Sequence, residues 1–256
     1  MYSICIKIQF TLKKVFKTKK SFLIEAYVHC PSGSLSYNNS IDAKYSSLII
    51  DSSCERLLLY SLSYSSITQI KLPDTLIQID DDAFYNIPVR EIDIPASTIQ
   101  ISTGNPFNYA HKLEKIVVNP LNPSYASVDY ILYNKNIDTL IHVPRKNGLK
   151  VYVAPRSLKK VQFHAFFYHE TIESIVFQST INIIEERSFQ NATTLESILI
   201  PNGHSIKRFG KTVFLNTNFN IDNITAYTDL YKSCRVISYS SFSITRLLFC
   251  SVFISM

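Results

Sequence analysis

ITQIKLPDTLIQIDDDAF, from Ile67 to Phe84, is followed four residues later by VREIDIPASTIQISTGNPF, from Val89 to Phe107. Three further segments share this pattern: GLKVYVAPRSLKKVQFHAF from Gly148, IESIVFQSTINIIEERSF from Ile172 and LESILIPNGHSIKRFGKTVF from Leu195. In four of the five copies, two apolar residues stand three apart and a phenylalanine follows five residues later. A period of this length is typical of a solenoid, in which successive coils stack and share one core.

Each copy begins with alternating residues that fit a short strand with one buried face. Ile70 and Leu72 point one way while Lys71 points the other. In four copies a proline, which cannot donate to a sheet, ends this run. We therefore predict a single right-handed repeat solenoid, mostly β, with short parallel strands paired in chain order and few short helical turns. The expected strands cover residues 70–72, 92–94, 116–118, 151–153, 175–177 and 198–200.

The phenylalanine that closes each copy stands next to a small residue in most copies. Such a ring can fill the space between two coils, because no single coil closes a core by itself. We expect these rings to be buried and stacked along one edge of the solenoid: Phe84, Phe107, Phe166 and Phe189.

The middle of the chain carries a longer variant of the same unit. LEKIVVNPLNPSYASVDYILYNKNIDTLIHVP, from Leu113 to Pro144, has an apolar strand, then N-P-x-Y, an aspartate, L-Y and a second apolar strand before proline. Together with the shorter copies, this segment resembles the BspA-like leucine-rich repeats, in which a glycine usually stands at the position of Tyr130. The resemblance implies a solenoid that binds proteins, in a family known from surface proteins of mucosa-associated bacteria and expanded in flagellate parasites.

Turn residues divide the enlarged copy. Residues 130–133 and 138–143 are β-prone, and Asn134, Lys135 and Asn136 between them favour a hairpin turn. We divide the chain into a basic tail and lead-in at 1–31, degenerate coils at 32–66, the repeats at 67–214 with the hairpin unit at 113–144, and a C-terminal cap and apolar tail at 215–256.

The charge of the chain does not indicate a nucleic-acid partner. The net charge is +6, but residues 1–20 hold six lysines and no acid, which leaves 20 of the 26 basic side chains against 20 acidic ones. A body with balanced charge lacks the broad basic surface that a phosphate backbone requires. We expect no nucleic-acid binding.

Cysteine number and spacing favour buried thiols. Cys5, Cys30, Cys54, Cys234 and Cys250 are too far apart for a C-x-x-C metal site, and an odd count argues against a closed disulfide framework. The lysines follow the first apolar run instead of preceding it, and the apolar residues 244–256 fall short of the ~20 that a membrane helix needs. We therefore expect no clear signal peptide and no transmembrane segment.

No motif predicts an enzyme, a cofactor or a metal site. Asp80, Asp81 and Asp82 have no acidic counterpart in most other copies, which is typical of a solvated turn. His164 and His169 lack a recognisable third ligand, so we interpret them as structural histidines. None of the five glycines forms a phosphate-binding loop, and no serine or cysteine stands in a nucleophile motif.

These observations predict a non-enzymatic scaffold for protein–protein interaction. By family resemblance it is a cell-surface antigen that binds host or matrix proteins in adhesion; the alternative is an intracellular, cytoplasmic structural or assembly repeat protein. The expected contact surface is the row of outward residues between the buried pair of each strand, since a solenoid sheet is a broad binding surface. That row contains Lys71, Asp93, Val117, Tyr152, Val176 and Leu199.

Overall fold

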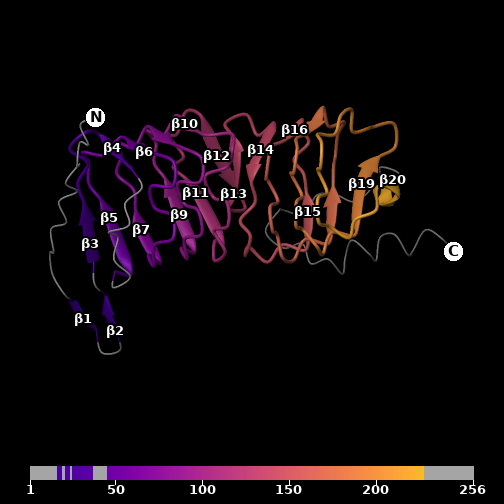
Figure 1. Ribbon diagram of the computed structural model, residues 1–256. Helices are drawn as coiled ribbons and strands as arrows, with labels where there is room; N and C mark the ends of the chain where they lie inside the picture. Colours follow the sequence, from indigo (N-terminus) through magenta and orange to yellow (C-terminus); the bar gives the residue numbers. More distant parts are fainter. Residues whose placement is uncertain (1–15, 19–20, 24, 37–44, 228–256) are drawn as a thin grey trace, which may run out of the picture.

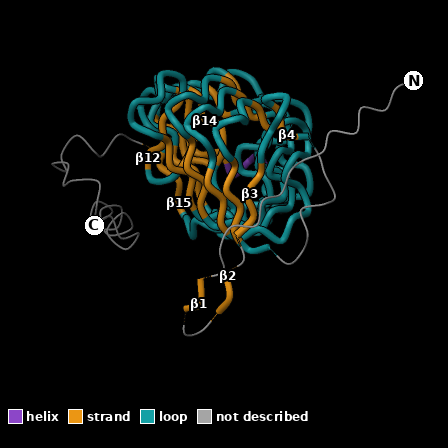
Figure 2. The backbone as a smooth tube through the Cα atoms, turned by 90° about the vertical axis from the view of Figure 1, so that its left-hand side faces the viewer, coloured by secondary structure: helices purple, strands orange, loops and turns teal. Residues whose placement is uncertain are grey.

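The computed structural model describes residues 16–18, 21–23, 25–36 and 45–227. It is a β-solenoid whose coils stack in chain order from one end to the other (Figure 1). Seen from the N-terminal end, strands make up only part of each coil and loops complete it (Figure 2). Residues 1–15, 19–20 and 24 of the predicted tail and lead-in (1–31) and residues 228–256 of the predicted cap and apolar tail (215–256) lie outside the described residues. The predicted mostly-β solenoid with parallel strands is confirmed.

One strand from each coil belongs to a first set, which we call the main strands. They pair in parallel and in chain order, as predicted, within three blocks: β3-β5-β7, β9-β11 and β15-β17-β19-β20. The predicted ladder is not continuous, because β7 does not pair with β9 and β11 does not pair with β15. In β9 the two isoleucines are buried while Asp93 between them is exposed, as the alternation requires. The main strands are β3 (Glu25–Val28), β5 (Ser47–Ile50), β7 (Gln69–Lys71), β9 (Glu91–Ile94), β11 (Lys115–Val118), β15 (Val151–Val153), β17 (Ser174–Val176), β19 (Ser197–Pro201) and β20 (Ile224–Tyr227).

A second set of two-residue strands follows the turn in each coil. Its members end on the second apolar residue of the repeat, such as Ile79 or Ile184, and that residue is buried. They are β4 (Ser34–Leu35), β6 (Arg56–Leu57), β8 (Gln78–Ile79), β10 (Gln100–Ile101), β16 (Lys160–Val161) and β18 (Ile183–Ile184). Outside these two sets, β1 (Phe16–Thr18) pairs antiparallel with β2 (Ser21–Leu23), and η1 (Ile221–Asn223) is a short 3-10 helix.

The enlarged copy forms the predicted hairpin. Here β13 (Ile131–Asn134) runs antiparallel to both β12 (Tyr125–Val128) and β14 (Thr139–His142), and β14 then joins β16 in parallel. Tyr130 has φ +65°, so the tyrosine adopts the left-handed conformation that a glycine would take there without strain. The tyrosine therefore has a backbone conformation that suits a glycine at this position.

The closing phenylalanines form a buried column, as predicted. Their exposed fractions are at most 1%, and the ring centroids of Phe84 and Phe107 stack 5.5 Å apart. On the other side of the enlarged coil, Phe166 and Phe189 stack at 4.8 Å. In the enlarged coil, the His142 ring lies 5.2 Å from the Phe107 ring. The buried Val143 next to it donates its N–H to the Ala165 carbonyl, as the phenylalanines of other coils do to the residue before the next ring.

The prediction of free cysteine thiols is wrong for one pair. Cys30 and Cys54, both buried, form a disulfide with their Cα atoms 5.0 Å apart. The odd number of cysteines was a poor guide, because stacking brings together residues that are about one repeat apart in the sequence. The resulting Cα–Cα distance is within the range that a disulfide spans. The other three cysteines lie outside the described residues.

Every phenylalanine of the column is flanked by two residues with left-handed backbone, one two positions before it and one two positions after it. We call this part of the coil the corner. Its two strained positions flank Phe84, Phe107, Phe166, Phe189, Phe214 and also Leu62 in an earlier coil. The residues before the ring are Tyr60, Asp82, Asn105, His164, Arg187 and Thr212, and those after it are Tyr64, Asn86, Tyr109, Tyr168, Asn191 and Asn216, with φ between +51° and +71°. None of these twelve is a glycine.

Candidate interaction surfaces

The main strands place five of the six predicted contact residues on one outward row. Asp93 pairs with Val117, and Val176 pairs with Leu199, so these residues occupy equivalent positions in neighbouring strands. Lys71 and Asp93 are exposed, whereas Val117 and Leu199 are half-buried. Val176 is only 9% exposed, so the apolar half of this row offers less free surface than we expected.

Tyr152 does not belong to the outward row, and its prediction as a contact residue is wrong. It pairs with the core residue Ile175, is 2% exposed, and its hydroxyl lies 3.0 Å from that of Tyr133 in a buried hydrogen bond. The outward residue of this strand is Val153, which is 45% exposed. Alternation could not show which residues of this strand point inward, because V-Y-V is apolar throughout. The proline was the better signal: in other copies it directly follows the second inward residue, which here is Ala154.

A second surface, which the sequence analysis did not identify, follows the corner. Tyrosine rings from successive coils touch there in series, and we call them the tyrosine ridge. Tyr85 lies 5.7 Å from Tyr60, 5.3 Å from Tyr64 and 5.0 Å from Tyr109, measured between ring centroids. Tyr109 in turn lies 5.2 Å from Tyr168 across the enlarged coil. The sequence signal was a tyrosine one or two residues after the ring of the repeat, as in A-F-Y and F-N-Y.

Charged groups stand at both ends of the ridge. At one end the Arg145 guanidinium lies 4.9 Å from the centre of the Tyr168 ring and 2.9 Å from a carboxylate oxygen of Glu170. At the other end, Asp82 accepts a hydrogen bond from Asn108 at 2.8 Å, and burial raises the pKa of its carboxyl. Within the described part of the chain, no ion pair involves the carboxylates at residues 80–82, and Asp81 Oδ1 is buried without a hydrogen-bond donor.

Beneath the ridge, a buried polar network joins the coils on either side of the enlarged unit. The Asn105 amide donates to His142 Nδ1 at 2.9 Å and to the His164 carbonyl at 3.0 Å, and Asn105 Oδ1 accepts from the Phe107 N–H. His164 Nδ1 in turn lies 2.9 Å from Asn108 Oδ1. These side chains satisfy backbone groups where the regular stacking of the corner is interrupted.

The histidines of this region are packed side chains, as interpreted from the sequence. His169 accepts a hydrogen bond from the Ile172 N–H at Nδ1 and lies 2.9 Å from Asn147 Oδ1 at Nε2. Burial lowers the pKa of His142 to about 3, and burial also lowers the pKa of His164 and of His169 to about 4. Each imidazole is therefore neutral at pH 7.

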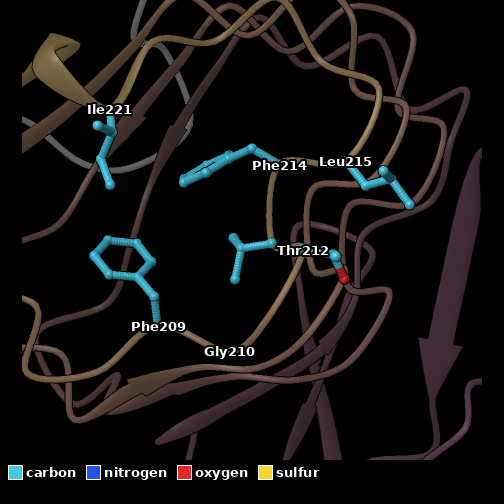
Figure 3. Close-up of a pocket in the computed structure, with 7 residues that line it drawn as sticks. Phe209, Gly210, Thr212, Phe214, Leu215 and Ile221 are labelled. Atoms are coloured by element: carbon cyan, nitrogen blue, oxygen red, sulfur yellow. The ribbon is translucent and has the colours of Figure 1, made fainter.

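A hollow of about 380 Å³ lies at the C-terminal end of the described coils (Figure 3). Phe209, Val213, Phe214 and Ile221 supply most of its wall, and Phe214 continues the phenylalanine column at 5.5 Å from Phe189. Thr212 is the only lining residue with a polar side chain. The described residues that line the hollow therefore extend the apolar core and include no set of polar groups for catalysis.

Among the described residues, no helix has the length and apolar content needed to cross a membrane. Over the same residues, no group of three or more His, Cys, Asp or Glu side chains is arranged to hold a metal ion.

Solved structures with the same fold are leucine-rich-repeat proteins of bacteria. A leucine rich cell surface protein from Faecalibacterium prausnitzii A2-165 is similar with a TM-score of 0.58 and 21% identity, covering 68% of this chain and 52% of that one. This chain thus spans about half the length of that protein. A leucine-rich repeat protein from Eubacterium ventriosum ATCC 27560 is similar with a TM-score of 0.52 and 15% identity, covering 81% and 75%.

No curated protein matches the chain in sequence. The family description that matches is the BspA type leucine rich repeat region, in six copies over residues 36–147 and 144–253. These matches span most of the chain and include the enlarged coil with its left-handed Tyr130. The chain therefore belongs to the family of BspA-type leucine-rich-repeat proteins.

Proposed function

We propose that this protein is a non-enzymatic scaffold at a cell surface, where it binds host or matrix proteins in adhesion. The observation that carries the proposal is the division of roles among its side chains. The buried polar groups hold the coils together, whereas the exposed members of the outward row and of the tyrosine ridge are available to a partner. Repeat scaffolds bind partners through extended surfaces, since neighbouring coils present side chains at equivalent positions.

The Cys30–Cys54 disulfide supports a surface location over the cytoplasmic alternative. Disulfides persist in oxidising compartments and are rare in the cytosol, where thiols are kept reduced. Surface biotinylation of intact cells, followed by fractionation, tests this point directly. Recovery of the protein only in the unlabelled cytosolic fraction would support the intracellular assembly protein instead.

The outward row is the first surface to test for adhesion. Replacement of Val153 and Leu199 by lysine changes two outward residues of the main strands without touching the core. We expect folded protein by circular dichroism and reduced attachment of cells to a panel of purified matrix proteins. Tyr152→Ser is the matched control in the same strand, because it removes a core side chain and should unfold the protein. Full attachment by the folded double variant would exclude this row from binding.

A further inference from the structure

We propose that the tyrosine ridge binds a protein segment that presents arginine side chains, with the carboxylates at residues 80–82 as their counter-charges. This inference rests on the proposed function and names the chemistry of one partner. The ridge consists of Tyr60, Tyr64, Tyr85, Tyr109 and Tyr168.

The fold itself does not require tyrosine at these positions. In the last coils the equivalent corner residues are Arg187, Gln190, Asn191 and Asn216. Of these, Arg187, Asn191 and Asn216 have the same left-handed backbone as four of the ridge tyrosines. The core beneath is filled by the phenylalanine column in both regions. The ridge rings therefore serve neither the backbone conformation nor the closing of the core.

Four of the five tyrosines are placed against their local preference. Tyr60, Tyr64, Tyr109 and Tyr168 have φ values of +58°, +57°, +57° and +53°. A bulky residue is rare in this region of backbone space, whereas asparagine is several-fold enriched there. Local stability alone would therefore favour asparagine at these positions, as at Asn191 and Asn216 of the last coils, so local stability does not explain the tyrosines.

The rings are also accessible. Tyr64 is 64% exposed and Tyr60 is 39% exposed, and Tyr85 between them is half-buried. Tyrosine is among the residues that contribute most to protein interfaces, since it offers a large rigid surface with a polar end.

The charges favour a cationic partner. At the far end of the ridge, Tyr168 already holds a guanidinium, that of Arg145, with the Glu170 carboxylate as its counter-charge. At the near end, no cation among the described residues pairs with the carboxylates at 80–82 or lies over the rings of Tyr60, Tyr64 and Tyr85. A guanidinium from a partner would stack on an exposed ring and face the carboxylates, which reproduces the arrangement at Tyr168. A neutral glycan could stack on the rings but would not use the carboxylates.

The test uses the full chain and fluorescent peptides of alternating glycine and arginine, with glycine–glutamate peptides and a neutral oligosaccharide for comparison. Fluorescence anisotropy should show saturable binding of the arginine peptide alone, and added salt should weaken it. Binding of the oligosaccharide but not the peptide, or equal binding of both peptides, would overturn the proposal.

A ridge variant then tests the site. Tyr64→Asn, Tyr85→Gln and Tyr109→Asn together install the kinds of residue that the last coils carry, so the fold should be retained. We expect at least a tenfold loss of affinity for the arginine peptide, and a smaller loss for Asp81→Asn. The matched control is Gln190→Ala with Asn216→Ala, at corner positions of the polar coils, and it should bind as the unaltered chain does. Unchanged binding by the folded ridge variant would refute the site.

The outcomes separate this inference from the proposed function. If the arginine peptide does not bind but the variant of the outward row loses attachment to matrix proteins, the ridge proposal fails and the scaffold proposal stands. If the unaltered chain attaches to no matrix protein and to no cell, the scaffold proposal itself fails.

Discussion

The corner of the first coils and the corner of the last coils have the same backbone but different side chains. Both place left-handed residues on either side of a buried ring, and both pack that ring on its neighbour at 4.8 to 5.5 Å. Outside the core, however, the first coils display touching tyrosines and the last coils display asparagine, glutamine and arginine. The comparison indicates that stacking requires the inward ring and the left-handed backbone of the corner. The outward side chains are not required for stacking, so they can be selected for binding.

The largest losses of stability should be the same in both regions, because the phenylalanine column forms the core of both. Phe84→Ala and Phe189→Ala each remove a fully buried ring, and we expect each to lower the free energy of unfolding by about 3 to 5 kcal/mol. Urea unfolding of the two variants measures this. Phe214→Ala removes a ring that is only half-buried, so it is the control and should cost less. A loss at Phe84 or Phe189 of under about 1 kcal/mol would show that the column is not a shared core.

The buried histidines between the two regions should make the free energy of unfolding fall at acidic pH. The pKa of His142 is about 3 in the folded chain and those of His164 and His169 are about 4, whereas an unfolded histidine titrates near its ordinary value of 6.5. Below pH 6.5 the unfolded chain therefore binds more protons, and stability falls as the pH falls. Each histidine should contribute a slope of up to about 1.4 kcal/mol per pH unit.

Urea unfolding at pH 7, 6 and 5 checks this dependence, and His142→Gln should reduce the slope by about one histidine's share. Above about pH 8 these three groups contribute no pH dependence, because the histidines are then neutral in both the folded and the unfolded state. Equal stability at pH 7 and pH 5 in the unaltered chain would contradict the burial of these imidazoles.

Smaller gains in stability should come from relieving backbone strain at the corner of the first coils or at that of the last coils. Tyr64→Asn in the first coils and Thr212→Asn in the last coils both place asparagine at an exposed left-handed position. We expect each to raise the free energy of unfolding by about 1 kcal/mol, since bulky and β-branched residues are strained there. Thermal unfolding measures the gain. Lys112→Asn, at an exposed position without left-handed backbone, should bring none, and an equal gain there would remove strain as the cause.

The smallest effect concerns the cation at the end of the ridge. Arg145→Gln removes the guanidinium from the Tyr168 ring, and we expect a loss of about 0.5 to 1 kcal/mol. A double-mutant cycle with Tyr168→Leu isolates the pair, because the two losses should not add. Additive losses would show that ring and guanidinium do not interact, and would weaken the use of this pair as a pattern for the partner.

Much of the fold could be predicted from the sequence, because a repeat states the same information several times. The strands, the hairpin at Asn134 and the buried phenylalanines all follow from spacing that recurs in each copy. The phase of the strand at Tyr152 could not be read from alternation, because three apolar residues in a row satisfy either phase. The division of the chain at residues 32, 67 and 215 stays a prediction.

The candidate surfaces were less accessible to sequence reasoning. The tyrosine ridge is made by residues from different coils. Contact between these residues depends on the distance between successive coils along the solenoid axis. The partner of Asn105 shows the same limit, since His142 is 37 residues away and adjacent only because the enlarged coil intervenes. The Cys30–Cys54 bond likewise depends on stacking, which a count of cysteines does not reveal.

That bond has a mechanical consequence. An array held by nearest-neighbour contacts frays from its ends, where a coil has a neighbour on one side only. Cys30 follows β3 and Cys54 follows β5, so a covalent link ties together the first two main strands, and among the described residues no other such link occurs. Under a pulling force the described array should peel from β20 toward β5, while the first two coils stay joined as a clamp until the disulfide is reduced.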